Sequence, residues 1–97
     1  MKEQVKKIVA EAIEELNEQL DDDKKLSFDP EVRLIGRKAM IDSMSFVTLI
    51  SIIEELVSDE LDKDIEIVSA KAFSQERSPF YNIGTLIDFV TSLVEEA

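Results

Sequence analysis

The sequence predicts an all-α protein, a four-helix bundle with a long loop between its first two helices and a short third helix. Three long segments place apolar residues three and four positions apart, which is the period of an α-helix that buries one face. A chain of 97 residues can cover these apolar faces only by packing the helices together. The chain is too short for a second folded unit, so we expect residues 1–97 to form one domain.

The first helix is expected over residues 4–20, where the apolar residues form one stripe. The stripe consists of Val5, Ile8, Val9, Ala12, Ile13, Leu16 and Leu20. The acidic run 21–23 ends this helix, and Asp29 is kept out of helical geometry because it precedes Pro30. A long loop therefore follows, pinned to the core by the apolar residues of 27–41. The three aspartates lack the glycine and closing glutamate of a calcium-binding loop, so we expect no metal there.

The second helix is expected over residues 44–61, which contain neither glycine nor proline. Its main apolar line consists of Val47, Ile50, Ile53, Leu56 and Val57. Phe46 and Ile52 lie beside this line, so the apolar arc is wider than one stripe. Such a helix packs against two layers or binds a partner. Phe46 is accordingly either a core residue beneath the loop 28–34 or a partner contact.

Two weaker patterns follow the second helix. Residues 64–68 alternate briefly between polar and apolar and can be extended. Ser69 can cap a short third helix that ends at Phe73.

The last helix is expected from Ile83 to the end of the chain, with Asn82 or Ser78 as its cap. Pro79 indicates a loop before this helix, and we expect Phe80 and Tyr81 to anchor that loop.

Composition limits the functions that are open to this chain. Its 22 Asp and Glu residues against 11 Lys and Arg give a net charge of -11, which repels nucleic acid and anionic lipid surfaces and favours basic protein partners. The absence of Cys and His excludes thiolate or imidazole metal ligands and Ser/His/Asp or cysteine catalysis. With no apolar run long enough for a membrane and no signal peptide, we expect a cytoplasmic, monomeric protein that does not insert into membranes.

The most informative stretch is 40–50, where the long loop brings Asp42 and Ser43 to the start of the second helix. A helix N-terminus favours an anion by about 0.3 to 1 kcal/mol. No basic residue occurs between positions 39 and 62, so nothing nearby in the sequence can deprotonate Ser43 for nucleophilic attack. Ser43 is therefore better explained as a residue that another enzyme modifies, and we expect the chain not to be an enzyme. The simpler alternative is that Asp42 or Ser43 only caps the helix.

The start of this helix, Asp42-Ser43-Met44, resembles the attachment motif of the acyl carrier protein family. The order of the helices and the acidity of the chain extend this resemblance to nearly all of its residues. Two further stretches are similar to family patterns, the Val-x-Leu-Ile of 47–50, which the family buries, and the Ile-Glu-Ile of 65–67. The resemblance implies that a phosphopantetheinyl transferase attaches 4'-phosphopantetheine from coenzyme A to Ser43, with Asp42 and Met44 completing the motif. The arm would carry acyl or aminoacyl thioesters in fatty acid, other lipid or polyketide biosynthesis.

The chain departs from the family pattern at several positions. Met40 replaces a usual glycine, Ser45 and Thr48 replace acidic residues, and the loop 75–81 is longer. The differences at Ser45 and Thr48 predict weak recognition by the usual fatty-acid synthases. Asp42-Ser43-Met44 followed by the Val-x-Leu-Ile of 47–50 resembles the D-alanyl carrier branch, or a dedicated carrier of a special lipid, polyketide or aminoacyl pathway.

The resemblance also implies partner enzymes that load and transfer acyl groups and that have basic docking surfaces. Asp42, Phe46, Glu54 and Glu55 are the candidate docking residues, although Glu54 and Glu55 can equally be solvated residues near a helix end. The rival hypothesis is an acidic helical adaptor that carries no prosthetic arm.

Overall fold

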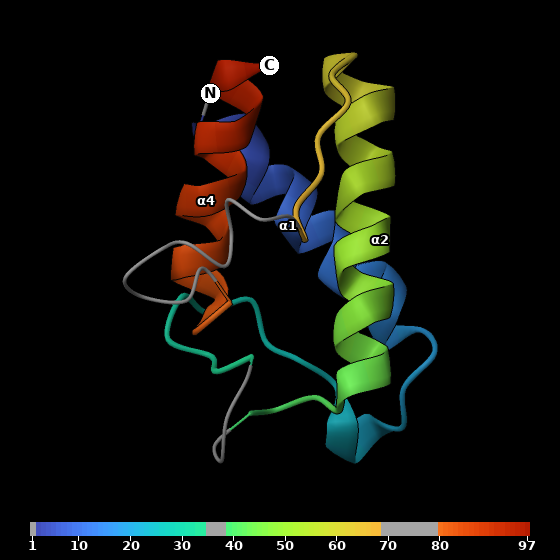
Figure 1. Ribbon diagram of the computed structural model, residues 1–97. Coiled ribbons are helices and arrows are strands. Elements are labelled where there is room, and N and C mark those ends of the chain that lie inside the picture. The colour runs from blue at the N-terminus through green and yellow to red at the C-terminus, as the bar shows by residue number, and fades with distance from the viewer. Residues whose placement is uncertain (1, 35–38, 69–79) are drawn as a thin grey trace.

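The computed structural model describes residues 2–34, 39–68 and 80–97. Within these ranges the chain forms three α-helices, α1 (Lys2–Asn17), α2 (Ser43–Leu61) and α4 (Ile83–Glu96), and one short 3-10 helix, η1 (Asp22–Lys24). Helix α1 packs against both α2 and α4 (Figure 1). The described part of the chain is therefore all-α, as predicted, and the short helix expected over 69–73 lies outside it.

Helix α1 buries the predicted stripe but ends earlier than the sequence pattern indicates. The helix stops at Asn17, not at Leu20. The side chain of Asn17 pairs with the backbone of Leu26, accepting from its N–H at 2.8 Å and donating to its carbonyl at 2.9 Å. This pairing turns the chain back at the end of α1, while Leu20 still packs against the core. The run of aspartates then forms η1 within a segment that was expected to be loop throughout.

The loop before α2 is pinned to the core, as expected, through Val32, Leu34 and Ile41, whereas Phe28 and Met40 are exposed. Leu26 and Leu34 are buried, and Arg33 forms an isolated antiparallel bridge with Asn82. The N–H of Gly84 donates to the carbonyl of Pro30 at 3.0 Å. A Cβ atom on Gly84 would lie only 3.2 Å from the Cβ of Pro30, so this close approach favours glycine. The loop thus lies across the start of α4.

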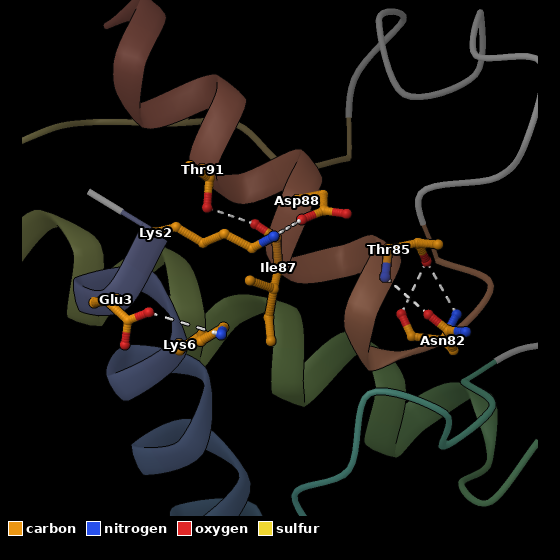
Figure 2. Close-up of polar contacts among 8 residues, drawn as sticks. All are labelled: Lys2, Glu3, Lys6, Asn82, Thr85, Ile87, Asp88 and Thr91. Atoms are coloured by element: carbon orange, nitrogen blue, oxygen red, sulfur yellow. Dashed lines mark hydrogen bonds and ion pairs between the residues drawn. The ribbon is translucent and has the colours of Figure 1, made fainter.

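Helix α4 begins with a capping box formed by Asn82 and Thr85 (Figure 2). The Asn82 side chain accepts from the N–H of Thr85 at 2.8 Å, and the Thr85 hydroxyl accepts from the N–H of Asn82 at 3.1 Å. The prediction of Asn82 as one of two possible caps is confirmed. An ion pair of 2.8 Å between Lys2 and Asp88 joins the exposed sides of α1 and α4 (Figure 2).

Three phenylalanines connect α2 to α4. Phe80 is buried and makes edge-to-face contacts with Phe46 of α2 and Phe89 of α4, at centroid distances of 5.3 and 6.5 Å. Phe46 therefore packs against the core, as one of its two interpretations predicted, but its ring contact is with Phe80 and not with the loop 28–34. The neighbouring Tyr81 ring lies 3.8 Å from the guanidinium carbon of Arg33. Phe80 and Tyr81 anchor the chain before α4, as the sequence suggested.

After α2, residues 62–68 turn back along that helix, and we call them the return segment (Figure 1). The segment has no regular secondary structure, although an extended conformation was considered for most of it. Ile67 is fully buried, and its N–H donates to a carboxylate oxygen of Glu54 at 2.8 Å. The hydroxyl of Ser58 donates to Asp64 at 3.3 Å. These contacts hold the return segment against α2.

Among residues 2–34, 39–68 and 80–97, no helix is long and apolar enough to cross a bilayer.

Candidate functional site

The candidate site is the corner at which the long loop meets α2. Ser43 is the first residue of α2. Helix α2 begins at the end of the molecule opposite the N and C labels (Figure 1). Asp42 precedes it with an extended backbone, and its carboxylate accepts from the N–H of Ser45 at 2.8 Å. The carbonyl of Asp42 accepts from the N–H of Phe46 at 2.9 Å, which is the first hydrogen bond of the helix. Asp42 is therefore the cap, and it fixes Ser43 in the first turn.

The described residues immediately before this corner, 39–42, include no glycine. The N–H of Met40 donates to the carbonyl of Arg33 at 3.0 Å. Met40 has no positive φ, so a methionine fits where the related pattern has glycine. A surface hollow of about 330 Å³ lies beside it, lined by Leu20, Ala39, Met40, Ile41, Asp42 and Ser45. The corner is thus built by backbone hydrogen bonds from the loop.

Apolar side chains are exposed on α2 next to Ser43. Met44 is 81% exposed and Val47 is 62% exposed. The resemblance placed Val47 in the core with Leu49 and Ile50, and this expectation is wrong, because only Leu49 and Ile50 are buried. Val47 lies off the face of α2 that packs on α1, since successive residues rotate by about 100° around a helix. An apolar surface therefore begins within one turn of Ser43.

This surface continues into a groove between α2 and the return segment, which we call the α2 groove. The groove has a volume of about 270 Å³. It is lined by Phe46, Val47, Ile50, Ser51 and Glu54 of α2 and by Glu66 and Val68 of the return segment. Because the hydrogen bond between Glu54 and Ile67 joins its two walls, Glu54 sets the position of the second wall.

The predicted docking residues have different environments. Asp42 and Glu55 are exposed, whereas Phe46 and Glu54 are half-buried. The structure brings Phe46 and Glu54 together in the α2 groove, and Glu55 does not line it. The hydrogen bond to Ile67 gives Glu54 a structural role that the sequence did not indicate.

Sequence reasoning did not select Glu66 as a site residue. The alternation of residues 64–68 could show that Glu66 lies opposite the buried Ile67, but it could not show that Glu66 meets α2.

Among the residues that the structure describes, no group of three or more His, Cys, Asp or Glu side chains is placed to hold a metal ion.

Comparisons with known proteins add no relative to this description. No family model matches the chain, and no similar protein was found among curated sequences or solved structures.

Proposed function

We propose that this chain is a carrier protein that holds acyl or aminoacyl groups as thioesters on a 4'-phosphopantetheine arm attached to Ser43. The observation that carries the proposal is the capped start of α2, where Asp42 fixes Ser43 in the first turn and exposed Met44 follows. A serine in the first turn of a helix suits a phosphoester, because the N-terminal end of the helix dipole favours an anion. The arm, when attached, supplies the thiol that forms the thioester.

The chemistry of attachment belongs to a phosphopantetheinyl transferase in this proposal. A phosphoester bond forms between the Ser43 oxygen and the phosphorus of the pantetheine phosphate, and the pyrophosphate bond of coenzyme A breaks. Adenosine 3',5'-bisphosphate is the leaving group, and a base of the transferase takes the serine proton. The carrier contributes position through the cap at Asp42, and it contributes the electrostatic field of the helix end.

The surface charge supports basic protein partners. Residues 39–62 contain six acidic side chains and no Lys or Arg. Within this stretch Asp42 and Glu55 are exposed, and Met44 and Val47 provide apolar area beside them. A transferase and the loading and transfer enzymes with basic docking surfaces would meet this side of the molecule. Complementary charge would act mainly on the association rate and would weaken with salt.

Incubation with coenzyme A and a broad-specificity transferase tests the proposal. The intact mass should rise by one phosphopantetheine, and Ser43→Ala should abolish the increase without unfolding the protein. Ser45→Ala is the matched control, since Ser45 lies two residues further along α2, and it should still gain the arm. A folded wild-type chain that gains no mass would contradict the proposal.

The alternative function is an acidic adaptor that binds a partner and carries no arm. The observation that favours it is the exposed apolar surface formed by Met44 and Val47, which a partner could cover without any covalent group. The same experiment separates the two functions, because an adaptor stays at its unmodified mass.

A further inference from the structure

The α2 groove lies in line with Ser43. Val47, Ile50 and Glu54 follow Ser43 at four, seven and eleven positions, which is the spacing of one stripe along a helix. All three residues line the groove. Neither this stripe nor the groove lining includes Ser45, Thr48 or Glu55. A group anchored at Ser43 and lying along α2 therefore has the groove as its nearest continuous surface on that stripe.

The chemistry of the groove changes along its length. The residues one turn beyond Ser43 are Phe46 and Val47, which are apolar. Glu54 lies three turns beyond it, about 16 Å along the helix axis at a rise of 1.5 Å per residue. Glu66 of the return segment also lines the groove, and the lining residues that the structure describes include no basic side chain. A group tethered at Ser43 therefore reaches the apolar end of the groove first and the carboxylate of Glu54 last.

We propose that the α2 groove receives the end of a small aminoacyl cargo, and that the carboxylates of Glu54 and Glu66 bind its ammonium group. This inference rests on the proposed function, and it narrows the cargo from acyl groups in general to those with a free amine. The occupant of the groove is then the cargo on the chain's own arm.

Charge complementarity favours an amine over a hydrocarbon tail. A fatty chain in the groove would remove water from two carboxylates without replacing their hydrogen bonds, which is unfavourable. An ammonium group instead supplies three donors and a positive charge. The volume of about 270 Å³ also suits a small cargo, because pockets for larger ligands span about 300 to 1,000 Å³.

Glu54 is already held in place for this role. One of its oxygens accepts from the N–H of Ile67 at 2.8 Å, which restricts the carboxylate before any cargo is present. A carboxylate has about four acceptor positions, so this bond leaves capacity for an ammonium group. Glu54→Gln keeps an oxygen that can accept from Ile67 while it removes the charge. The charge of Glu54 can therefore be tested without removing the hydrogen bond that holds the return segment.

The test compares two arms of the same shape. A broad-specificity transferase loads the protein from coenzyme A conjugates that carry alanyl or isobutyryl groups through a hydrolysis-resistant amide. The two cargoes differ by an ammonium in place of a methyl group. Backbone amide NMR shifts then report on the groove. The alanyl arm should shift the amides of Glu66, Ile67 and Val68 relative to the isobutyryl arm, and raised salt should reduce the difference.

Charge-neutral variants identify the residues responsible. The alanyl-specific shifts should be lost in the Glu54→Gln, Glu66→Gln double variant and reduced in Glu66→Gln alone. They should persist in Glu55→Gln, which removes one charge from α2 outside the groove. Equal shifts from both arms, or shifts that survive in the double variant, would overturn the inference while leaving the carrier function intact. Failure to load either arm would overturn the proposed function, and the inference with it.

Discussion

Asp62, at the end of α2, has a left-handed backbone with φ 53° and ψ 40°. In the ranges 2–34, 39–68 and 80–97 it is the only non-glycine residue with a positive φ. Asp62→Gly should raise the free energy of unfolding by about 0.5 to 1 kcal/mol, because glycine adopts this conformation without steric cost. Loss of a negative charge at a helix C-terminus acts in the same direction. Urea denaturation measures the change.

The control for this prediction is Asp59→Gly, the same substitution three residues earlier within α2. There the helical backbone does not need glycine, so the variant should lose stability by a few tenths of a kcal/mol. If Asp62→Gly were also destabilising, the left-handed conformation at Asp62 would be in question.

Some contacts of the site could be predicted from the sequence and others could not. The caps at Asp42 and Asn82 could be predicted, because each depends on a side chain and an N–H three residues apart. The bond from Ile67 to Glu54 could not be predicted, because its partners are thirteen residues apart and meet only when the chain turns back along α2. The exposure of Val47 was missed for a related reason. Periodicity shows which residues share a stripe, but it does not show which neighbours cover that stripe.

Between helices, the carboxyl group of Glu60 on α2 interacts with that of Glu11 on α1. A hydrogen bond with the Glu11 carboxyl group raises the pKa of Glu60. Partial desolvation and repulsion from Glu11 and Asp59 raise this pKa further, whereas the positive charge of Lys7 lowers it. The folded state therefore binds a proton at Glu60 more readily than the unfolded state does. This stabilisation is fully present below the unfolded pKa and is lost as pH rises through the folded pKa.

Glu60→Gln should consequently raise the melting temperature at neutral pH, because it removes the repulsion of Glu60 from Glu11 and Asp59. The advantage over wild type should shrink as the pH falls and Glu60 becomes protonated. Melting curves of both proteins across this pH range provide the measurement. Glu14→Gln, on the exposed side of α1, is the control and should show a smaller change. An equal, pH-independent effect of both variants would mean that only net charge matters.

The helices themselves were predictable wherever local sequence determines them. The buried stripe of α1 was predicted, and so were the extent of α2 and the start of α4, because apolar spacing and caps are local signals. The end of α1 was placed three residues late, since the pairing of Asn17 with Leu26 depends on contacts from another part of the chain. The predicted third helix lies beyond the described ranges.

For the whole molecule, the net charge of -11 should make stability depend on salt. Self-repulsion among surface carboxylates opposes the folded state, and salt screens it over a Debye length of about 10 Å at 0.1 M. The exposed ion pairs of Lys2, Lys6 and Lys25 would be weakened by salt, but each such pair contributes only about 0 to 1 kcal/mol. The melting temperature should therefore rise between low and moderate ionic strength. An unchanged or falling value would contradict this prediction.

We propose that the molecule carries a prosthetic arm on Ser43, and fragmentation mass spectrometry of the intact wild-type protein after incubation with transferase and coenzyme A locates this arm. We expect a single added phosphopantetheine, with every fragment that contains Ser43 carrying it or its phosphate remnant. Fragments that exclude Ser43 but include Ser45, Ser51 or Ser58 should be unmodified. An arm located on one of those serines, or a folded chain with no arm, would show that Ser43 is not the attachment site of a carrier protein.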